Sequence, residues 1–189
     1  MSKIRVAFAV CGSFCNISCV VKQMRILSNN YEILPIVSKN ASSIDTRFGK
    51  ANDIIDEIEK ISGKKILTKL TEVEPIGPKK MADIMLIAPC TGNTLSKICN
   101  GISNTAVTLG VKSHLRIGRP LLIALATNDG LGASAQNIGK MLNTKNVYFV
   151  PMHQDDPINK PNSLVSYFNL IERSIEFSLC CKQIQPIFR

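Results

Sequence analysis

Several patterns that would identify a function directly are missing from this 189-residue sequence. It contains no G-x-G-x-x-G run and no P-loop, which weighs against a bound dinucleotide or nucleoside triphosphate. No apolar run approaches the roughly 18 residues that a membrane-spanning helix needs, so we expect no membrane partner. The length suits a single domain over residues 1–189.

Clusters of basic residues are also missing, although basic charge is abundant. Lys and Arg total 23 against 14 Asp and Glu, and a net charge of +9 would suit nucleic acid. No run of five basic residues occurs, so we do not favour nucleic acid as a partner. Residues 84–154 hold six bases and one acid, Asp129, and so contribute +5. We interpret this excess as a site for small anions, such as a phosphate or a dicarboxylate.

The seven cysteines include no C-x-x-C pair, and the first residues show no secretory cleavage site. We therefore expect reduced thiols in a cytoplasmic protein. Cys11, Cys15 and Cys19 recur at steps of four and could hold a metal from one helix, but His114 and His153 stand far from them in the sequence. We predict no metal site and favour small buried side chains at the three cysteines.

Apolar runs typical of buried strands alternate with patterns of helical spacing. Strands are predicted over 5–10, 31–37, 83–88, 120–126 and 146–150, and helices over 17–27, 52–61, 94–102, 133–142 and, at the C-terminus, about 161–182. Pro35 indicates that its strand ends early or that its missing N–H does no harm there. The alternation predicts an α/β fold, a three-layer α/β/α Rossmann-like (flavodoxin-like) arrangement around a parallel sheet.

Polar turns follow four of these strands, at the sheet edge where such folds bind ligands. Gly12 and Ser13 offer free amides and a hydroxyl at a helix start, which suits one phosphate. The alternative is that Ser13 is simply an N-cap residue. The other three turns carry short hydrogen-bonding groups, and together the four favour a phosphate-bearing cofactor; they contain Ser38, then Thr91, Asn93 and Thr94, then Ala126, Thr127 and Asn128.

The turns resemble those of the flavin-binding family of phosphopantothenoylcysteine decarboxylases and related flavoproteins. The resemblance lies in Gly12-Ser13, in the run from Ala88-Pro89 through Thr91, Asn93 and Thr94 to Lys97, and in Ala126-Thr127-Asn128. It implies that FMN is bound, with Ser13, Ser38 and Thr91 at its phosphate. Asn93 and the Ala126–Asn128 turn would lie along its ribityl chain and ring. It also implies homo-oligomers, usually trimers or multiples of trimers.

Within this family, longer runs resemble the subfamily of dipicolinate synthase B subunits. These runs include 40–49, 74–79, 127–132, 154–157 and 160–163. The resemblance implies a partner, the A subunit of the synthase, that binds NADP. It also implies oxidation of a dihydrodipicolinate-type dicarboxylate to pyridine-2,6-dicarboxylate in the mother cell of a spore-forming bacterium. Pro75 falls where the decarboxylases carry a catalytic histidine, so decarboxylation is not expected.

Few side chains are candidates for catalysis. Arg47, Lys160 and Arg116 are candidates to meet the substrate carboxylates, and we favour Arg47 because it lies in a loop at the ligand edge. Asp129 either orients a donor, takes a proton, or caps the helix that follows it. Two other functions stay open: an FMN-dependent decarboxylase of another pathway, and a non-catalytic scaffold protein that has lost FMN.

Overall fold

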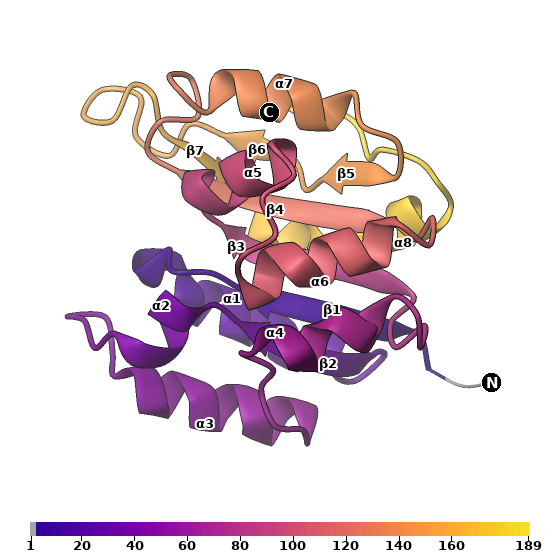
Figure 1. Cartoon of the computed structure of the whole chain (residues 1–189). Helices are drawn as coiled ribbons and strands as arrows, with labels where there is room; N and C mark the ends of the chain where they lie inside the picture. The colour runs from indigo at the N-terminus through magenta and orange to yellow at the C-terminus, as the bar shows by residue number, and fades with distance from the viewer. Residues whose placement is uncertain (1–2) are drawn as a thin grey trace.

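The computed structural model describes residues 3–189, and its strands form one seven-stranded sheet (Figure 1). The strand order is β2-β1-β3-β4-β7-β6, with β5 also paired to β4. The bounds are β1 Arg5–Val10, β2 Glu32–Val37, β3 Ile84–Cys90, β4 Leu121–Thr127, β5 Val147–Phe149, β6 Met152–His153 and β7 Leu164–Ser166. The predicted α/β fold is confirmed, but the sheet is mixed, because β7 runs antiparallel to both β4 and β6.

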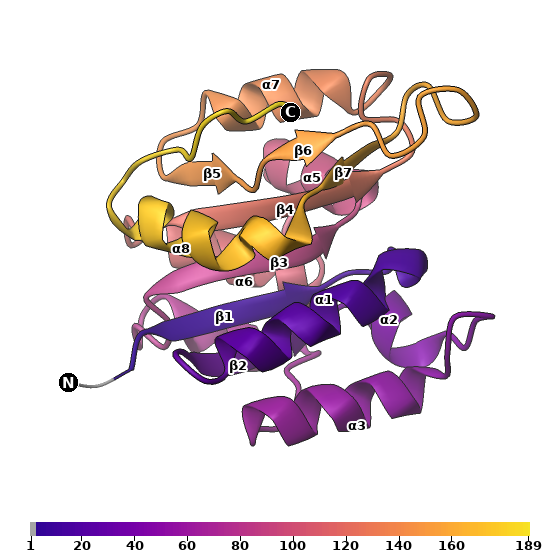
Figure 2. The same ribbon diagram turned by 180° about the vertical axis from the view of Figure 1, so that it is seen from behind.

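Helices cover both faces of the sheet and form the outer two layers. Their bounds are α1 Phe14–Leu27, α2 Lys39–Ser43, α3 Ala51–Ser62, α4 Leu70–Val73, the 3-10 turn η1 Glu74–Ile76, α5 Gly92–Cys99, α6 Ala106–Leu115, α7 Ala135–Leu142, the 3-10 turn η2 Phe168–Leu170 and α8 Ile171–Leu179. The helices α4, α5, α6 and α7 pack on the face toward the viewer in Figure 1. The opposite face, seen in Figure 2, carries α1 and α8.

The central strands have apolar residues at nearly every position because both of their faces are buried. In β1, Val6, Phe8 and Val10 face the layer of α1 and α8, whereas Ala7 and Ala9 face the layer of α5 and α6. All five side chains are fully buried. Strands covered on both faces show this continuous pattern instead of alternation, which is why the sequence located β1, β3 and β4 correctly.

Pro35 lies within β2 and does not end it. The strand continues to Val37 and is the outer strand on its side of the sheet. The carbonyl of Pro35 accepts a hydrogen bond from the Leu67 amide at 2.9 Å on that outer side. The missing N–H therefore removes no bond to β1. Of the two predicted possibilities, Pro35 lies where its missing N–H does no harm.

The C-terminal helix is shorter than predicted. We expected it over 161–182, but α8 covers Ile171–Leu179, and Leu164 belongs to strand β7. Leu164 and the apolar residues after it recur at the spacing of one helical face, which led to the prediction of a longer helix. The short run 164–166 instead pairs with β4 at Ala126 and Thr127, a contact that depends on residues almost 40 positions away.

Two of the three cysteines that we expected to be buried are exposed. Cys11 is buried, while Cys15 and Cys19 lie on the solvent side of α1. The reason is that Ile17, Val20 and their apolar neighbours orient α1 with the other face toward the sheet. Across residues 3–189, no helix is long and apolar enough to cross a membrane.

Candidate functional site

The carboxyl ends of β1, β2, β3 and β4 meet at one edge of the sheet, on the left in Figure 1. The loops before α3 and before β7 project from the same edge. All four polar turns identified in the sequence therefore come together. Two adjoining cavities lie among them.

The first cavity, here named the β1–β3 cavity, has a volume of about 380 Å³. Its lining is rich in short hydroxyl and amide side chains and includes two bases and no acid among the described residues. It is lined by Cys11, Gly12, Ser38, Lys39, Asn40, Thr91, Asn93, Thr94, Lys97, Thr105 and Val107. This combination suits an anion such as a phosphate.

The second cavity, named the β4–β7 cavity, also has a volume of about 380 Å³. It combines aromatic and small apolar side chains with a few polar groups, as small-molecule sites usually do. Its lining contains Gly12, Ser13, Phe14, Cys15, Asn16, Phe48, Thr91, Ala126, Thr127, Asn128, Asp155, Lys160, Ser163 and Val165. The two cavities share Gly12 and Thr91. Every residue that we predicted to bind a cofactor lines at least one of them.

The Ser13 hydroxyl is not used as a helix cap. Ser13 occupies the N-cap position of α1, yet its side chain makes no capping bond and instead accepts one from Asn16 Nδ2 at 3.0 Å. Ser38 and Thr91, in contrast, do cap the short helices that follow them, accepting from the amides of Ala41 and Thr94. The Asn16 amide donates to the Ser13 carbonyl at 2.9 Å, which leaves the amides of Phe14 and Cys15 available to an anion. The alternative that the Ser13 side chain merely caps the helix does not fit its contacts.

Burial keeps one side chain of the β1–β3 cavity neutral. Cys11 is fully buried, and burial raises the pKa of its thiol to about 11, although a hydrogen bond with Thr94 acts in the opposite direction. Thr94 Oγ1 lies 3.4 Å from Cys11 Sγ and 3.1 Å from Thr91 Oγ1. A neutral thiol adds no negative charge to the wall, which favours an anionic ligand.

Asp129 supports the turn that lines the β4–β7 cavity. Its carboxylate accepts hydrogen bonds from Thr127 Oγ1 and, at 2.9 Å, from Ser134 Oγ. The bond from Thr127 lowers the pKa of Asp129, partial burial raises it, and the bond from Ser134 lowers it further. Asp129 lines neither cavity within residues 3–189. Its contacts support a positioning role, and its part in proton transfer stays a prediction.

Gly92 is a residue of the site that the sequence analysis missed. A Cβ atom there would lie 2.6 Å from Thr127 Oγ1, 2.8 Å from Ser134 Oγ and 3.0 Å from Asp129 Oδ1. Only glycine lets the β3 and β4 turns approach so closely. The only feature of the sequence that could have pointed to Gly92 is its place between Thr91 and Asn93, two predicted site residues.

The candidate bases for substrate carboxylates lie in different places. Arg47 is exposed, with its guanidinium 4.9 Å from the centroid of the Phe48 ring, and Arg116 pairs with Glu74 at 3.4 Å. Neither of them lines the β1–β3 or the β4–β7 cavity, whereas Lys160 lines the β4–β7 cavity. Arg47 itself does not line this cavity, although the next residue, Phe48, does.

Most bases of residues 84–154 lie away from the two cavities. Of its six bases, Lys97 alone lines either cavity over residues 3–189, and Arg119 pairs with Asp83 at the opposite edge. Lys39 and Lys160, which line the cavities, come from outside that segment. The bases that line the cavities thus come from separate loops, and a role of this excess in binding small anions stays a prediction.

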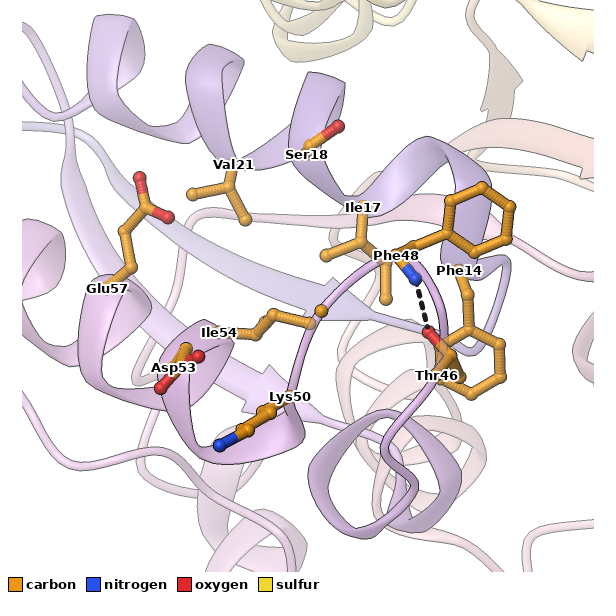
Figure 3. A pocket seen from close by; sticks show the side chains of 11 residues that line it. Phe14, Ile17, Ser18, Val21, Thr46, Phe48, Lys50, Asp53, Ile54 and Glu57 are labelled. Atoms are coloured by element: carbon orange, nitrogen blue, oxygen red, sulfur yellow. Dashed lines mark hydrogen bonds between the residues drawn. The ribbon is translucent and has the colours of Figure 1, made fainter.

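A third pocket, of about 200 Å³, lies between α1 and α3 (Figure 3). Phe14 and Phe48 line both this pocket and the β4–β7 cavity. Phe48 is held by its amide, which donates to Thr46 Oγ1 at 3.2 Å. The pocket contains two carboxylates, Asp53 and Glu57, so it is less suited to an anion than its neighbours.

Comparison with known proteins identifies the family of this chain. The family described as Flavoprotein matches residues 1–165. The chain belongs to the flavoprotein family. A curated relative, the B subunit of dipicolinate synthase from Bacillus subtilis (strain 168), is 38% identical over 184 residues, which are 97% of this chain and 92% of the relative.

Solved structures of similar flavoproteins support the same conclusion. The crystal structure of the dipicolinate synthase B subunit from Bacillus halodurans C matches with a TM-score of 0.90 and 37% identity, over 100% of this chain and 98% of that chain. The FMN-dependent cysteine decarboxylase SpaF shares the fold, with a TM-score of 0.67 and 20% identity over 94% of this chain and 95% of that chain. The resemblance to the B subunits is thus confirmed.

Proposed function

We propose that this flavoprotein is the FMN-binding B subunit of a dipicolinate synthase. One observation carries the proposal: two adjoining cavities at the carboxyl edge are lined by all nine predicted cofactor-binding residues. The similarity to the dipicolinate synthase B subunit of Bacillus subtilis over 97% of the chain supplies the substrate class. An A subunit that binds NADP is part of the proposal. The homo-oligomer, the trimer and the mother-cell cytoplasm stay predictions.

The residues present fit FMN. Ser13 and Ser38 lie on either side of the shared wall of Gly12 and Thr91, where the free amides at the start of α1 offer a place for the phosphate. Lys39 and Lys97 add positive charge in the β1–β3 cavity. Asn93 and the Ala126–Asn128 turn would lie along the ribityl chain and ring, with Phe14 and Phe48 closing the apolar side.

The proposed reaction converts a dihydropyridine dicarboxylate to the aromatic pyridine. The substrate loses one hydride and one proton, and NADP+ on the partner protein ends as NADPH. FMN, when bound, supplies a group that accepts a hydride equivalent. The chain itself would hold the substrate against the β4–β7 cavity and keep its carboxylates in place. No histidine lines either cavity in the described residues, which supports oxidation over decarboxylation.

Reconstitution tests the whole proposal. We expect the purified chain to carry a flavin absorbance band, or to gain one with added FMN. Together with the A subunit, NADP+ and the dihydro precursor, it should form pyridine-2,6-dicarboxylate. The rate is measured by NADPH absorbance with and without this chain. An equal rate without the chain would refute its catalytic role, and a colourless chain that FMN does not stabilise would refute the cofactor.

A single hydroxyl tests where the phosphate lies. Ser13→Ala should weaken FMN binding by about tenfold or more, because a hydrogen bond to a charged group is lost while no helix cap is removed. The dissociation constant is measured from the quenching of flavin fluorescence. Ser43→Ala is the matched control, since this exposed serine lines neither cavity. Equal affinities for the two variants would contradict the assignment.

A further inference from the structure

The β4–β7 cavity contains one basic and one acidic side chain among its described lining residues, Lys160 and Asp155. Lys160 Nζ lies 3.4 Å from Asp155 Oδ2, and the two side chains are 53% and 30% exposed. Charge-assisted hydrogen bonds are usually near 2.7–2.9 Å, and exposed ion pairs contribute little to stability. The pair is therefore weak, and the lysine can exchange its partner at little cost.

The loop between β6 and β7 fixes the backbone of Lys160. Its amide donates to the Asp156 carbonyl at 2.8 Å, and its carbonyl accepts from the Ser163 amide at 3.0 Å. Ser163 Oγ in turn donates to the Thr127 carbonyl at 3.3 Å, in the turn that lines the same cavity. The Asp156 carboxylate caps the loop by accepting from the amide of Asn159. Lys160 is thus presented to the cavity by a hydrogen-bonded turn at the edge seen in Figure 1.

The other bases offered for this role are less well placed. Arg116 pairs with Glu74, and the Arg47 guanidinium lies over the Phe48 ring outside the lining. Lys39 and Lys97 line the β1–β3 cavity, and Lys97 Nζ donates to Asn104 Oδ1 at 3.2 Å. A dianionic substrate entering the β4–β7 cavity therefore meets Lys160 as the base in its wall.

We propose that Lys160 binds one carboxylate of the dicarboxylate substrate and that Asp155 holds the lysine in position until the substrate displaces it. This inference rests on the proposed function. Asp155 then acts as an internal competitor for the lysine. The empty cavity carries a neutral ion pair, and the carboxylate of a ligand has to replace Asp155 as the partner of Lys160.

The test uses pyridine-2,6-dicarboxylate and pyridine-2-carboxylate as probes, with binding to the full chain measured by calorimetry. Lys160→Met should weaken binding of both probes about tenfold, because each loses the positive partner of one carboxylate. Lys160→Arg should restore most of this affinity, because the guanidinium keeps the positive charge. Asp155→Asn should tighten binding of the dicarboxylate by about threefold, because the competing charge is gone.

Lys140→Met is the matched control, because this exposed lysine on α7 lines neither cavity. It should bind both probes as the unaltered chain does. An unchanged affinity for pyridine-2,6-dicarboxylate in Lys160→Met would overturn the inference, as would weaker binding in Asp155→Asn. FMN titration of every variant separates the two proposals. If the unaltered chain binds no FMN, the proposed function fails, whereas calorimetry on the flavin-free chain still decides the role of Lys160.

Discussion

Gly77→Ala is expected to destabilise the protein by about 3 kcal/mol or more, which is the upper end of what overpacking usually does. Gly77 follows η1 and is buried against α6. A Cβ atom at this position would lie 1.9 Å from the Ser113 carbonyl oxygen and 2.8 Å from Ser113 Oγ. The first of these atoms is backbone within a helix, so no rotamer change can remove the clash.

The clash also breaks hydrogen bonds that join η1 to α6. The Gly77 amide donates to Ser113 Oγ at 3.0 Å, and that hydroxyl donates to the Glu74 carbonyl at 2.6 Å. Moving η1 away from α6 would leave these buried groups without partners, which adds to the loss. Gly77 lies in the run 74–79 that helped to identify the subfamily, and its role there is one of close packing.

Denaturant-induced unfolding measures this effect as a change in the free energy of unfolding. Gly139→Ala is the matched control, because no atom lies within 4 Å of a Cβ at that position inside α7. That variant should gain up to about 1 kcal/mol from the better helix propensity of alanine. Equal unfolding midpoints for Gly77→Ala and the unaltered chain would mean that η1 does not pack on α6 as described.

Local patterns predicted most of the sheet and the polar turns at its edge. Strands β1, β3 and β4 are buried on both faces, so their continuous apolar runs were enough to locate them in the sequence. In a parallel sheet the ends of such strands must lie together, and this brought Ser13, Thr91 and Thr127 into one site without any knowledge of long-range contacts.

Contacts between distant segments explain what the sequence did not predict. Strand β7 is three residues long, and it is a strand only because β4 and β6 pair with it. Reading residues 161–170 as helix missed the strand that brings the end of the preceding loop to β4. The helix α6 was also missed, because its buried Thr108, Ser113 and His114 interrupt the apolar pattern. The packing role of Gly92 could not be inferred, since it depends on side chains from another turn.

His114 shows how one buried side chain can control the acid stability of this fold. It is completely buried on α6, and its Nε2–H donates to the Pro120 carbonyl at 3.1 Å. Nδ1 has no hydrogen-bond partner among residues 3–189. The pKa of His114 is lowered from 6.5 to about 4, mainly by burial. The bond to Pro120 raises it, Arg119 lowers it and the charge of Asp83 raises it. The ring is therefore uncharged at neutral pH. His114 also lines neither cavity, so it is not placed to carry a proton to a ligand there.

This pKa difference predicts a loss of stability as the pH falls below about 6.5. The unfolded chain binds a proton at His114 more tightly than the folded chain, so between pH 6.5 and 4 it holds more protons. The contribution of the neutral histidine is therefore complete above pH 6.5 and declines toward pH 4, by about 3 kcal/mol in total and about 2 kcal/mol by pH 5.

His114→Gln separates this contribution from the titration of the carboxylates, which both proteins share. Free energies of unfolding are measured for both at several pH values between 7.5 and 5. The variant is expected to be less stable than the unaltered chain at pH 7.5, because it disturbs a buried contact. The difference should shrink by about 2 kcal/mol by pH 5, since the glutamine has no proton to gain. Parallel curves would show that His114 is not held neutral by its surroundings, and would reopen it as a group able to carry a proton near neutral pH.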